Sequence, residues 1–102
     1  MIYITVLIYL NEGKENVFQE FENLALSMLS DYNGMLLMRL RPNESSIVSF
    51  EGEKERPYEV HFLSFDSEQG FQAYINDSRR KEFLHLKEES IHTILMVKGE
   101  KV

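Results

Sequence analysis

Apolar positions along the chain follow a two-residue repeat in some segments and a helical repeat in others. Segments 2–10, 35–41, 58–65 and 91–97 are rich in β-branched, aromatic and other apolar residues, which predicts four strands. In segments 2–10 and 58–65 the alternation places apolar side chains on both faces. We therefore expect neither face of the resulting sheet to be wholly open to water.

Between the first two predicted strands, apolar residues recur at near-ideal helical spacing, which predicts a helix. These residues are Val17, Phe18, Phe21, Leu24, Ala25, Met28, Leu29 and Tyr32. We expect the opposite face of this helix to be polar and to carry Glu15, Gln19 and Glu22. The pair Asn33-Gly34 then supplies a left-handed cap at the carboxyl end of the helix.

A second helix is predicted after the third strand. Asp66 and Ser67 are short polar residues whose side chains accept hydrogen bonds from the free N–H groups of a helix start. The buried stripe of this helix is formed by Phe71, Tyr74 and Ile75. The run Asn76-Asp77-Ser78 favours local side-chain hydrogen bonds, so we expect the helix to break there. A second short helix is expected beyond the break, with the apolar residues Phe83, Leu84 and Leu86.

The longest connection runs from residue 42 to residue 57. Within it, residues 47–50 favour a short additional strand in an extended hairpin. The charged run Glu53-Lys54-Glu55-Arg56 is expected to be a solvated tip. The chain has no repeats and no low-complexity segment, so we expect residues 1–102 to form one domain.

The predicted order of elements, βαββαβ, is that of the ferredoxin-like fold. In this α+β fold a four-stranded antiparallel sheet carries its helices on one face. The other face is expected to carry Leu7, Leu37, Leu63, Phe65 and an apolar residue of the last strand. A bare apolar face of this kind is an interaction surface, and a two-fold dimer is a closed and self-complementary way to cover it. We therefore expect a homodimer that packs sheet against sheet.

Charge and composition exclude several classes of protein. The net charge of −6 and the pI near 5.0 argue against binding to nucleic acid and to anionic membrane surfaces. The chain has no cysteine, which excludes disulfides, zinc–thiolate sites and thiol nucleophiles. The apolar run 2–10 is too short to span a bilayer and has no basic segment before it, so we expect a cytoplasmic protein.

Short motifs that point to one family are spread over nearly the whole chain. They are Asn33-Gly34, Arg39-Leu40-Arg41-Pro42, Glu51-Gly52, Pro57-Tyr58-Glu59-Val60-His61, Phe65, Phe71, Tyr74, Arg80 and Phe83-Leu84-His85-Leu86-Lys87. Together they resemble the uncharacterised family called domain of unknown function 1330, within the dimeric α/β-barrel superfamily. The resemblance implies a ferredoxin-like homodimer in which two sheets form a barrel-like core. It implies no single reaction, because the superfamily includes cofactor-free monooxygenases, haem-degrading enzymes, muconolactone isomerases and stress-induced proteins.

One group of polar residues is a candidate small-molecule site. We expect strand alternation to place on the sheet face away from the helices the residues Tyr3, Thr5, Tyr9, Arg39, Glu59 and His61. The first and third strands of a ferredoxin-like sheet are neighbours, which brings Tyr3, Thr5 and His61 together. A histidine beside a carboxylate serves as a general base, and an arginine holds a carboxylate or an enolate. The same residues would also make an ion-pair network between subunits.

Metal and haem sites have little support in the sequence. Glu82-x-x-His85 has the spacing of carboxylate di-iron bundles, but that chemistry needs a second such motif on a facing helix. A site built from His61, His85 and His92 has no further support, and tryptophan, which is common in the haem-degrading relatives, is absent. We therefore expect no metal and no cofactor.

Two further patterns suggest nucleic acid or phosphate binding and are weak. Residues 2–7 and 56–58 echo the RNA-recognition motif, which has the same topology, but Pro57 and Val60 replace its glycine and its stacking aromatic residue. The cluster Arg79-Arg80-Lys81 is expected to be a solvated or salt-bridged turn.

Together the patterns predict a small homodimer of unknown biochemical function that binds a small molecule in a pocket on the sheet face. Two alternatives stay open: a cofactor-free enzyme of monooxygenase or isomerase type, and a structural or stress-related dimer without a ligand. A cavity that contains Arg39 and His61 would favour ligand binding or catalysis, whereas a dry and tightly packed dimer core would favour the structural role.

Overall fold

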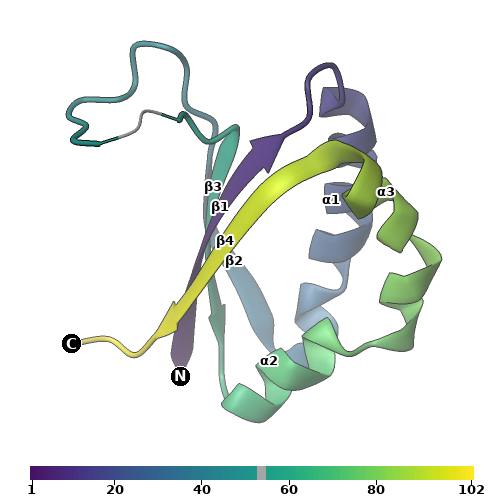
Figure 1. Ribbon diagram of the computed structural model, residues 1–102. Helices are drawn as coiled ribbons and strands as arrows, with labels where there is room; N and C mark the ends of the chain where they lie inside the picture. Colours follow the sequence, from purple (N-terminus) through teal and green to yellow (C-terminus); the bar gives the residue numbers. More distant parts are fainter. Residues whose placement is uncertain (53–54) are drawn as a thin grey trace.

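The computed structural model describes residues 1–52 and 55–102. Their strands form one four-stranded sheet, and the helices lie together on one side of it (Figure 1). The main elements follow the order βαββαβ, which confirms the predicted ferredoxin-like α+β fold. Of the predicted charged tip, Glu53 and Lys54 lie outside the described residues, and Glu55 and Arg56 are exposed.

The sheet consists of β1 (Ile2–Leu10), β2 (Gly34–Leu40), β3 (Glu59–Phe65) and β4 (Ile91–Gly99). The strand order is β2-β3-β1-β4, and each neighbouring pair is antiparallel. β1 and β3 are therefore the central neighbours, as predicted. Both are rich in the β-branched and aromatic residues that pack well in the interior of a sheet.

The first helical segment follows β1 and precedes β2 in the chain, and it packs on one face of the sheet. α1 (Glu15–Ser27) is followed by the short 3-10 helix η1 (Leu29–Tyr32). Asn33 ends the segment with a φ of 56°, which confirms the predicted left-handed cap. None of the described helices is both long and apolar enough to cross a membrane.

The second helical segment is broken, as the sequence predicts. It consists of α2 (Glu68–Ile75), the 3-10 helix η2 (Ser78–Glu82) and α3 (Leu84–Ser90). The side chain of Ser67 caps α2 by accepting a hydrogen bond from the backbone N–H of Gly70 at 3.1 Å. The side chain of Asp77 caps η2 in the same way, so local side-chain hydrogen bonds replace helix continuation at the break.

The predicted additional strand at residues 47–50 is wrong. These residues have no regular structure, and Val48 is 98% exposed. An apolar, β-branched segment becomes a strand only where a neighbouring strand completes its hydrogen bonds, and the described part of the sheet places none beside this one.

The helices cover one face of the sheet, lined by alternate residues of the central strands. These are Ile2, Ile4, Val6 and Ile8 on β1 and Glu59, His61, Leu63 and Phe65 on β3, all of them buried. The prediction that Leu63 and Phe65 face away from the helices is therefore wrong. Leu63 pairs with Ile4 across the sheet, and the ring of Phe65 packs on the rings of Phe71 and Tyr74 from α2.

An irregularity in β2 decides where its arginines point. Leu36 pairs with Leu63 and Arg39 pairs with His61, with a register shift between Leu36 and Met38. An extra residue in one strand reverses the alternation beyond it. Leu36 and Arg39 therefore both face the helices, although they are three positions apart and regular alternation would place them on opposite faces.

The opposite face of the sheet, named the open face from here on, has none of the described helices over it (Figure 1). Its apolar residues are Leu7, Met35, Leu37, Met38, Leu40, Val60, Phe62, Leu95 and Val97. Those on the edge strands β2 and β4 are about half exposed, between 45% and 61%. The prediction of an apolar face without helical cover is thus confirmed for Leu7, Leu37 and the last strand.

Replacement of Phe65 tests the core. Phe65→Ala removes a fully buried ring, so we expect a loss of about 3–5 kcal/mol in the free energy of unfolding. The matched control is Phe50→Ala, because Phe50 is 45% exposed and its loss should change stability by less than about 1 kcal/mol. Urea denaturation at several protein concentrations measures both, and equal losses would contradict the assignment of Phe65 to the core.

Candidate functional site

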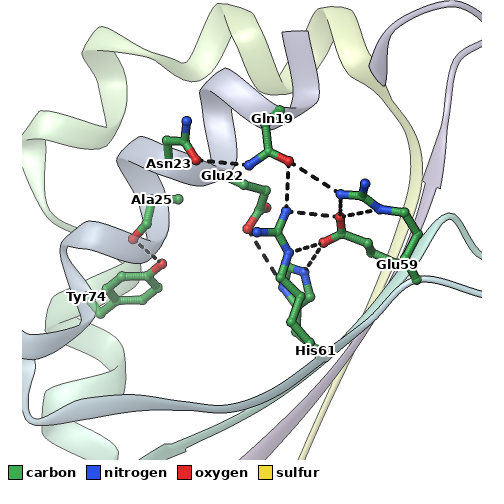
Figure 2. Close-up of polar contacts among 9 residues, drawn as sticks. Gln19, Glu22, Asn23, Ala25, Glu59, His61 and Tyr74 are labelled. Atoms are coloured by element: carbon green, nitrogen blue, oxygen red, sulfur yellow. Dashed lines mark hydrogen bonds and ion pairs between the residues drawn. The ribbon is translucent and has the colours of Figure 1, made fainter. Parts of the chain in front are cut away.

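A buried carboxylate, that of Glu59, lies at the centre of a polar cluster between the sheet and α1 (Figure 2). Its Oε1 accepts hydrogen bonds from Arg39 Nε at 2.5 Å and from His61 Nε2 at 2.6 Å. Its Oε2 accepts from Arg39 Nη2 at 2.9 Å and from Arg41 Nε at 3.1 Å. Both oxygens are therefore bound to side chains of β2 and β3 or of the residue that follows β2.

The helix α1 supplies the other half of this cluster. Gln19 Oε1 accepts hydrogen bonds from the Nη2 atoms of Arg39 at 3.2 Å and Arg41 at 3.4 Å. Glu22 is 5% exposed, and its Oε2 lies 3.8 Å from His61 Nδ1. The prediction that Gln19 and Glu22 lie on the solvent face of the helix is therefore wrong. Glu22 follows Phe18 by four residues and precedes Ala25 by three, so the helical repeat itself places it in the buried stripe.

Opposing effects act on the pKa of Glu59. Burial raises the pKa, because a charged carboxylate loses hydration. The hydrogen bonds donated by His61, Arg39 and Arg41 outweigh burial and lower the pKa from 4.5 to about 2. Glu59 is therefore an anion at neutral pH.

The anionic Glu59 decides the tautomer of His61. Because Nε2 lies 2.6 Å from a carboxylate oxygen, it carries the proton and donates it to Glu59. In neutral His61 the lone pair is then on Nδ1, on the side of Glu22. Burial raises the pKa of Glu22, His61 lowers it, and the charge of Glu59 raises it, with a net shift upward.

A small interior cavity lies beside Glu22 and His61. It is bounded by α1, β1, β3, β4 and the segment from α2 to α3, and its polar lining consists of Glu22, His61, Tyr74, Arg80 and Lys87. The rest of the lining is mainly apolar, including Val6, Phe21, Leu63 and Met96. Its volume is about 50 Å³, which is room for a few water molecules or a small organic fragment. This space is named the interior cavity below.

Arg80 reaches this cavity from η2. Its guanidinium carbon lies 4.7 Å from the centre of the Tyr74 ring, a cation–π contact. The hydroxyl of Tyr74 donates to the carbonyl of Ala25 at 2.9 Å, which fixes the ring on α1 (Figure 2). Nη1 of Arg80 is buried and has no hydrogen-bond partner among the described residues.

Charged residues around the helix break hold η2 in place. Arg79 Nη2 donates to Asp77 at 2.8 Å and to Asp31 at 2.9 Å, and the hydroxyl of Tyr32 donates to Asp77. The prediction of a salt-bridged turn is thus confirmed for Arg79. Arg80 is different, because it turns inward, and the run of basic residues in the sequence carries no signal for that orientation.

The predicted site residues are divided between the two faces of the sheet. Glu59, His61 and Arg39 face the helices, so the prediction that they share the open face with Tyr3 and Thr5 is wrong. The register pairs Thr5 with Phe62, whereas His61 pairs with Val6. Tyr3 and Thr5 instead line a shallow depression of about 410 Å³ on the open face, together with residues 97–101. A role in ligand binding for either stays a prediction.

The histidines outside the cluster do not gather. His85 on α3 and His92 on β4 are exposed. In the described part of the chain, no three or more His, Cys, Asp or Glu residues are grouped in a way that could hold a metal ion.

Comparison with known proteins shows the fold. No family model and no curated protein matches the chain, so membership of the family named domain of unknown function 1330 stays a prediction. The RPA0582 protein of unknown function from Rhodopseudomonas palustris is 10% identical, with a TM-score of 0.83 over 99% of this chain and 82% of that chain. A DABB family protein with a ferredoxin-like fold from Mesorhizobium loti is 14% identical, with a TM-score of 0.67 over 99% and 96% of the two chains. A dimeric protein of unknown function with a ferredoxin-like fold from Bacteroides fragilis is 14% identical, with a TM-score of 0.69 over 98% and 95%.

Replacement of Glu59 tests the cluster. Glu59→Gln leaves two arginines without their anion, so we expect a loss of about 3–5 kcal/mol in stability at pH 7. The folded-state pKa of about 2 lies below the ordinary 4.5, so this contribution is complete above pH 4.5 and is lost as the pH falls toward 2. Denaturation at a series of pH values should show the difference from the wild type shrinking in that range.

The exposed Glu88 provides the control for this experiment. Glu88→Gln should leave stability within about 0.5 kcal/mol of the wild type at every pH. A difference between the wild type and Glu59→Gln that did not change with pH would contradict an ionised, stabilising Glu59.

Proposed function

We propose that the chain functions as a homodimer that binds a small organic molecule in the interior cavity. The observation that carries the proposal is the guanidinium group of Arg80, a residue of the cavity wall whose buried Nη1 has no hydrogen-bond partner among the described residues. A buried polar group without a hydrogen bond costs about 1–3 kcal/mol, and an oxygen of a bound ligand would recover this. Buried polar groups in native proteins nearly always have a partner, so the unpaired Nη1 supports binding of a molecule beside Arg80.

The chemistry of the lining supports the same proposal. Most of the lining is apolar, and a few polar groups, Glu22, His61 and Arg80, converge on the space. This is the usual composition of a small-molecule site, where apolar walls supply affinity and placed polar groups supply orientation. The volume of about 50 Å³ suits a ligand of a few heavy atoms. Met96, which is 43% exposed, and Lys87 have flexible side chains, and their movement would admit a larger ligand.

The partner of the open face is a second copy of the chain. The apolar residues of the open face run across all four strands, and an apolar sheet face of this kind suits a two-fold packing of sheets. One of the compared proteins with this fold is described as dimeric. Such an interface would also bury Tyr3 and Thr5, which are polar residues of the open face.

A structural dimer without a ligand is the second candidate. One observation favours it, namely that Arg39 and Arg41 are paired with Glu59 within a single chain. These groups have satisfied one another, so they bind no ligand directly and act as supports of His61. The two candidates differ in one respect: whether the interior cavity takes up a small anion.

A charge on the open face tests the dimer. Leu95→Glu places a carboxylate at an apolar position of β4 that is 51% exposed, so we expect the dimer to dissociate into folded monomers. The matched control is Leu24→Glu, because Leu24 is 41% exposed on α1 and lies away from the open face. Light scattering measures the mass of both, and a Leu95→Glu variant that stayed dimeric would place the interface elsewhere.

Binding is tested with acetate and pyruvate as probes, by titration of amide and histidine signals in NMR spectra. We expect saturable shifts at Ala25, His61 and Leu63. Arg80→Gln should weaken binding by about tenfold or more, because it removes a charged donor. Lys81→Gln, at the next and exposed residue, should have no effect. Absence of saturable shifts with both probes would favour the structural dimer.

A further inference from the structure

The arrangement of His61, Glu59 and Arg80 goes beyond binding. We infer that His61 is a general base that removes a proton from the bound molecule, and that Arg80 holds the oxygen on which the negative charge develops. The substrate class is a small enolisable carbonyl compound. This inference rests on the proposed function, since it requires the ligand to occupy the interior cavity.

The first argument is the fixed orientation of His61. Its Nε2 donates to Glu59 at 2.6 Å, and the imidazole is buried, so the ring has one position and one tautomer. A buried carboxylate that orients a histidine and stabilises its cationic form is the arrangement by which histidine bases are prepared for proton removal. Arg39 and Arg41 hold Glu59 in turn, which makes these three residues positioning residues.

The second argument is the direction of the free nitrogen. Nδ1 lies 3.8 Å from Glu22, too far for a direct hydrogen bond, and His61 and Glu22 both line the interior cavity. The lone pair on Nδ1 is therefore available to a molecule in that space. A histidine whose two nitrogens were both bound to the protein would have no such capacity.

The third argument is the position of the unpaired cation. Removal of a proton next to a carbonyl group leaves an enolate, whose charge lies mainly on oxygen. Arg80 lines the same cavity as His61, and its Nη1 has no partner among the described residues. A desolvated donor beside the developing charge stabilises the transition state more than the ground state. Arg80 is thus suited to stabilise the enolate oxygen, and His61 is suited to accept the proton.

The step balances without any further reactant. The C–H bond next to the carbonyl breaks, its electron pair forms the C=C bond, and the π electrons of the carbonyl move to oxygen, where Arg80 donates a hydrogen bond. The proton forms a new N–H bond at Nδ1 of His61. Return of this proton to the same carbon regenerates the ketone. Delivery of a proton from Glu22, whose pKa burial raises, to a different atom, followed by transfer of the proton on Nδ1 to Glu22, would make the result a net tautomerisation.

Proton removal requires a free lone pair on Nδ1 of His61. The charged and titratable groups that face His61 come from every surrounding element. They are Glu59 from β3, Glu22 from α1, Arg39 from β2, Arg80 from η2 and Lys87 from α3. Protonation of Nδ1 removes the lone pair whichever of these groups dominates.

Exchange of hydrogen for deuterium tests the inference. The wild-type dimer in D2O is mixed with pyruvate or 2-butanone, and loss of the C–H signals next to the carbonyl is followed by proton NMR. We expect exchange above the buffer rate, with a decrease of about 100-fold or more in His61→Gln. His85→Gln changes an exposed histidine and should exchange like the wild type. Arg80→Gln, at the edge of the cavity, should also lose exchange, which provides a second variant if His61→Gln does not fold.

Glu59→Gln and Glu59→Asp separate a positioning role from a structural one. In folded Glu59→Gln we expect the exchange rate to fall while saturable pyruvate binding persists, and Glu59→Asp should recover part of the rate.

The outcomes distinguish the two levels of the proposal. Pyruvate binding without exchange in the wild type would overturn the general base and leave the binding function standing. Exchange that survives both His61→Gln and Arg80→Gln would also overturn it. Absence of both binding and exchange would overturn the proposed function together with this inference.

Discussion

The structure depends on the burial of one carboxylate. Glu59 has no exposed surface, and an ion removed from water is tolerated only where hydrogen bonds and opposite charges replace its hydration. Arg39, Arg41 and His61 supply these bonds. The bulge in β2 is necessary for this, because without it Arg39 would point to the open face. The pairing of β2 with β3 and the packing of α1 on the sheet therefore both help to stabilise the buried charge of Glu59.

One sheet presents two surfaces with different chemistry. His61 and Phe62 are adjacent in the chain, yet one lies in a polar cluster under the helices and the other in an apolar face without helical cover. Because consecutive side chains of a strand point in opposite directions, the proposed ligand site and the proposed partner surface lie on opposite faces of the same four strands. The two proposed roles are structurally separable, since no side chain of β3 takes part in both.

Much of the fold follows from local signals, and the site follows from them only in part. The strands, the left-handed Asn33 and the helix break at Asp77 each depend on a few neighbouring residues. His61, Glu59 and Arg39 were recognisable as a chemical group, because a base, a carboxylate and a guanidinium on adjacent strands suggest one. Glu22 was identifiable from its place in the helical repeat, but its charge argued for the surface. Arg80 had no such signal, since its direction depends on where η2 places it beside the Tyr74 ring of α2.

The sequence by itself determined the order of the four sheet strands and of the helices, and in β1 and β3 the division of the side chains into two sets. It did not determine which set is inside. A period of two fits equally well whichever set faces the helices. Hydrophobicity does not decide it either, because the apolar Leu63 and Phe65 share their set with the ionisable Glu59 and His61. Only the tertiary structure broke this symmetry. The register of β3 against β1 placed that set under the helices, and the arginines on and just beyond β2 then made burial of Glu59 stable, because their bonds replace the water that Glu59 loses.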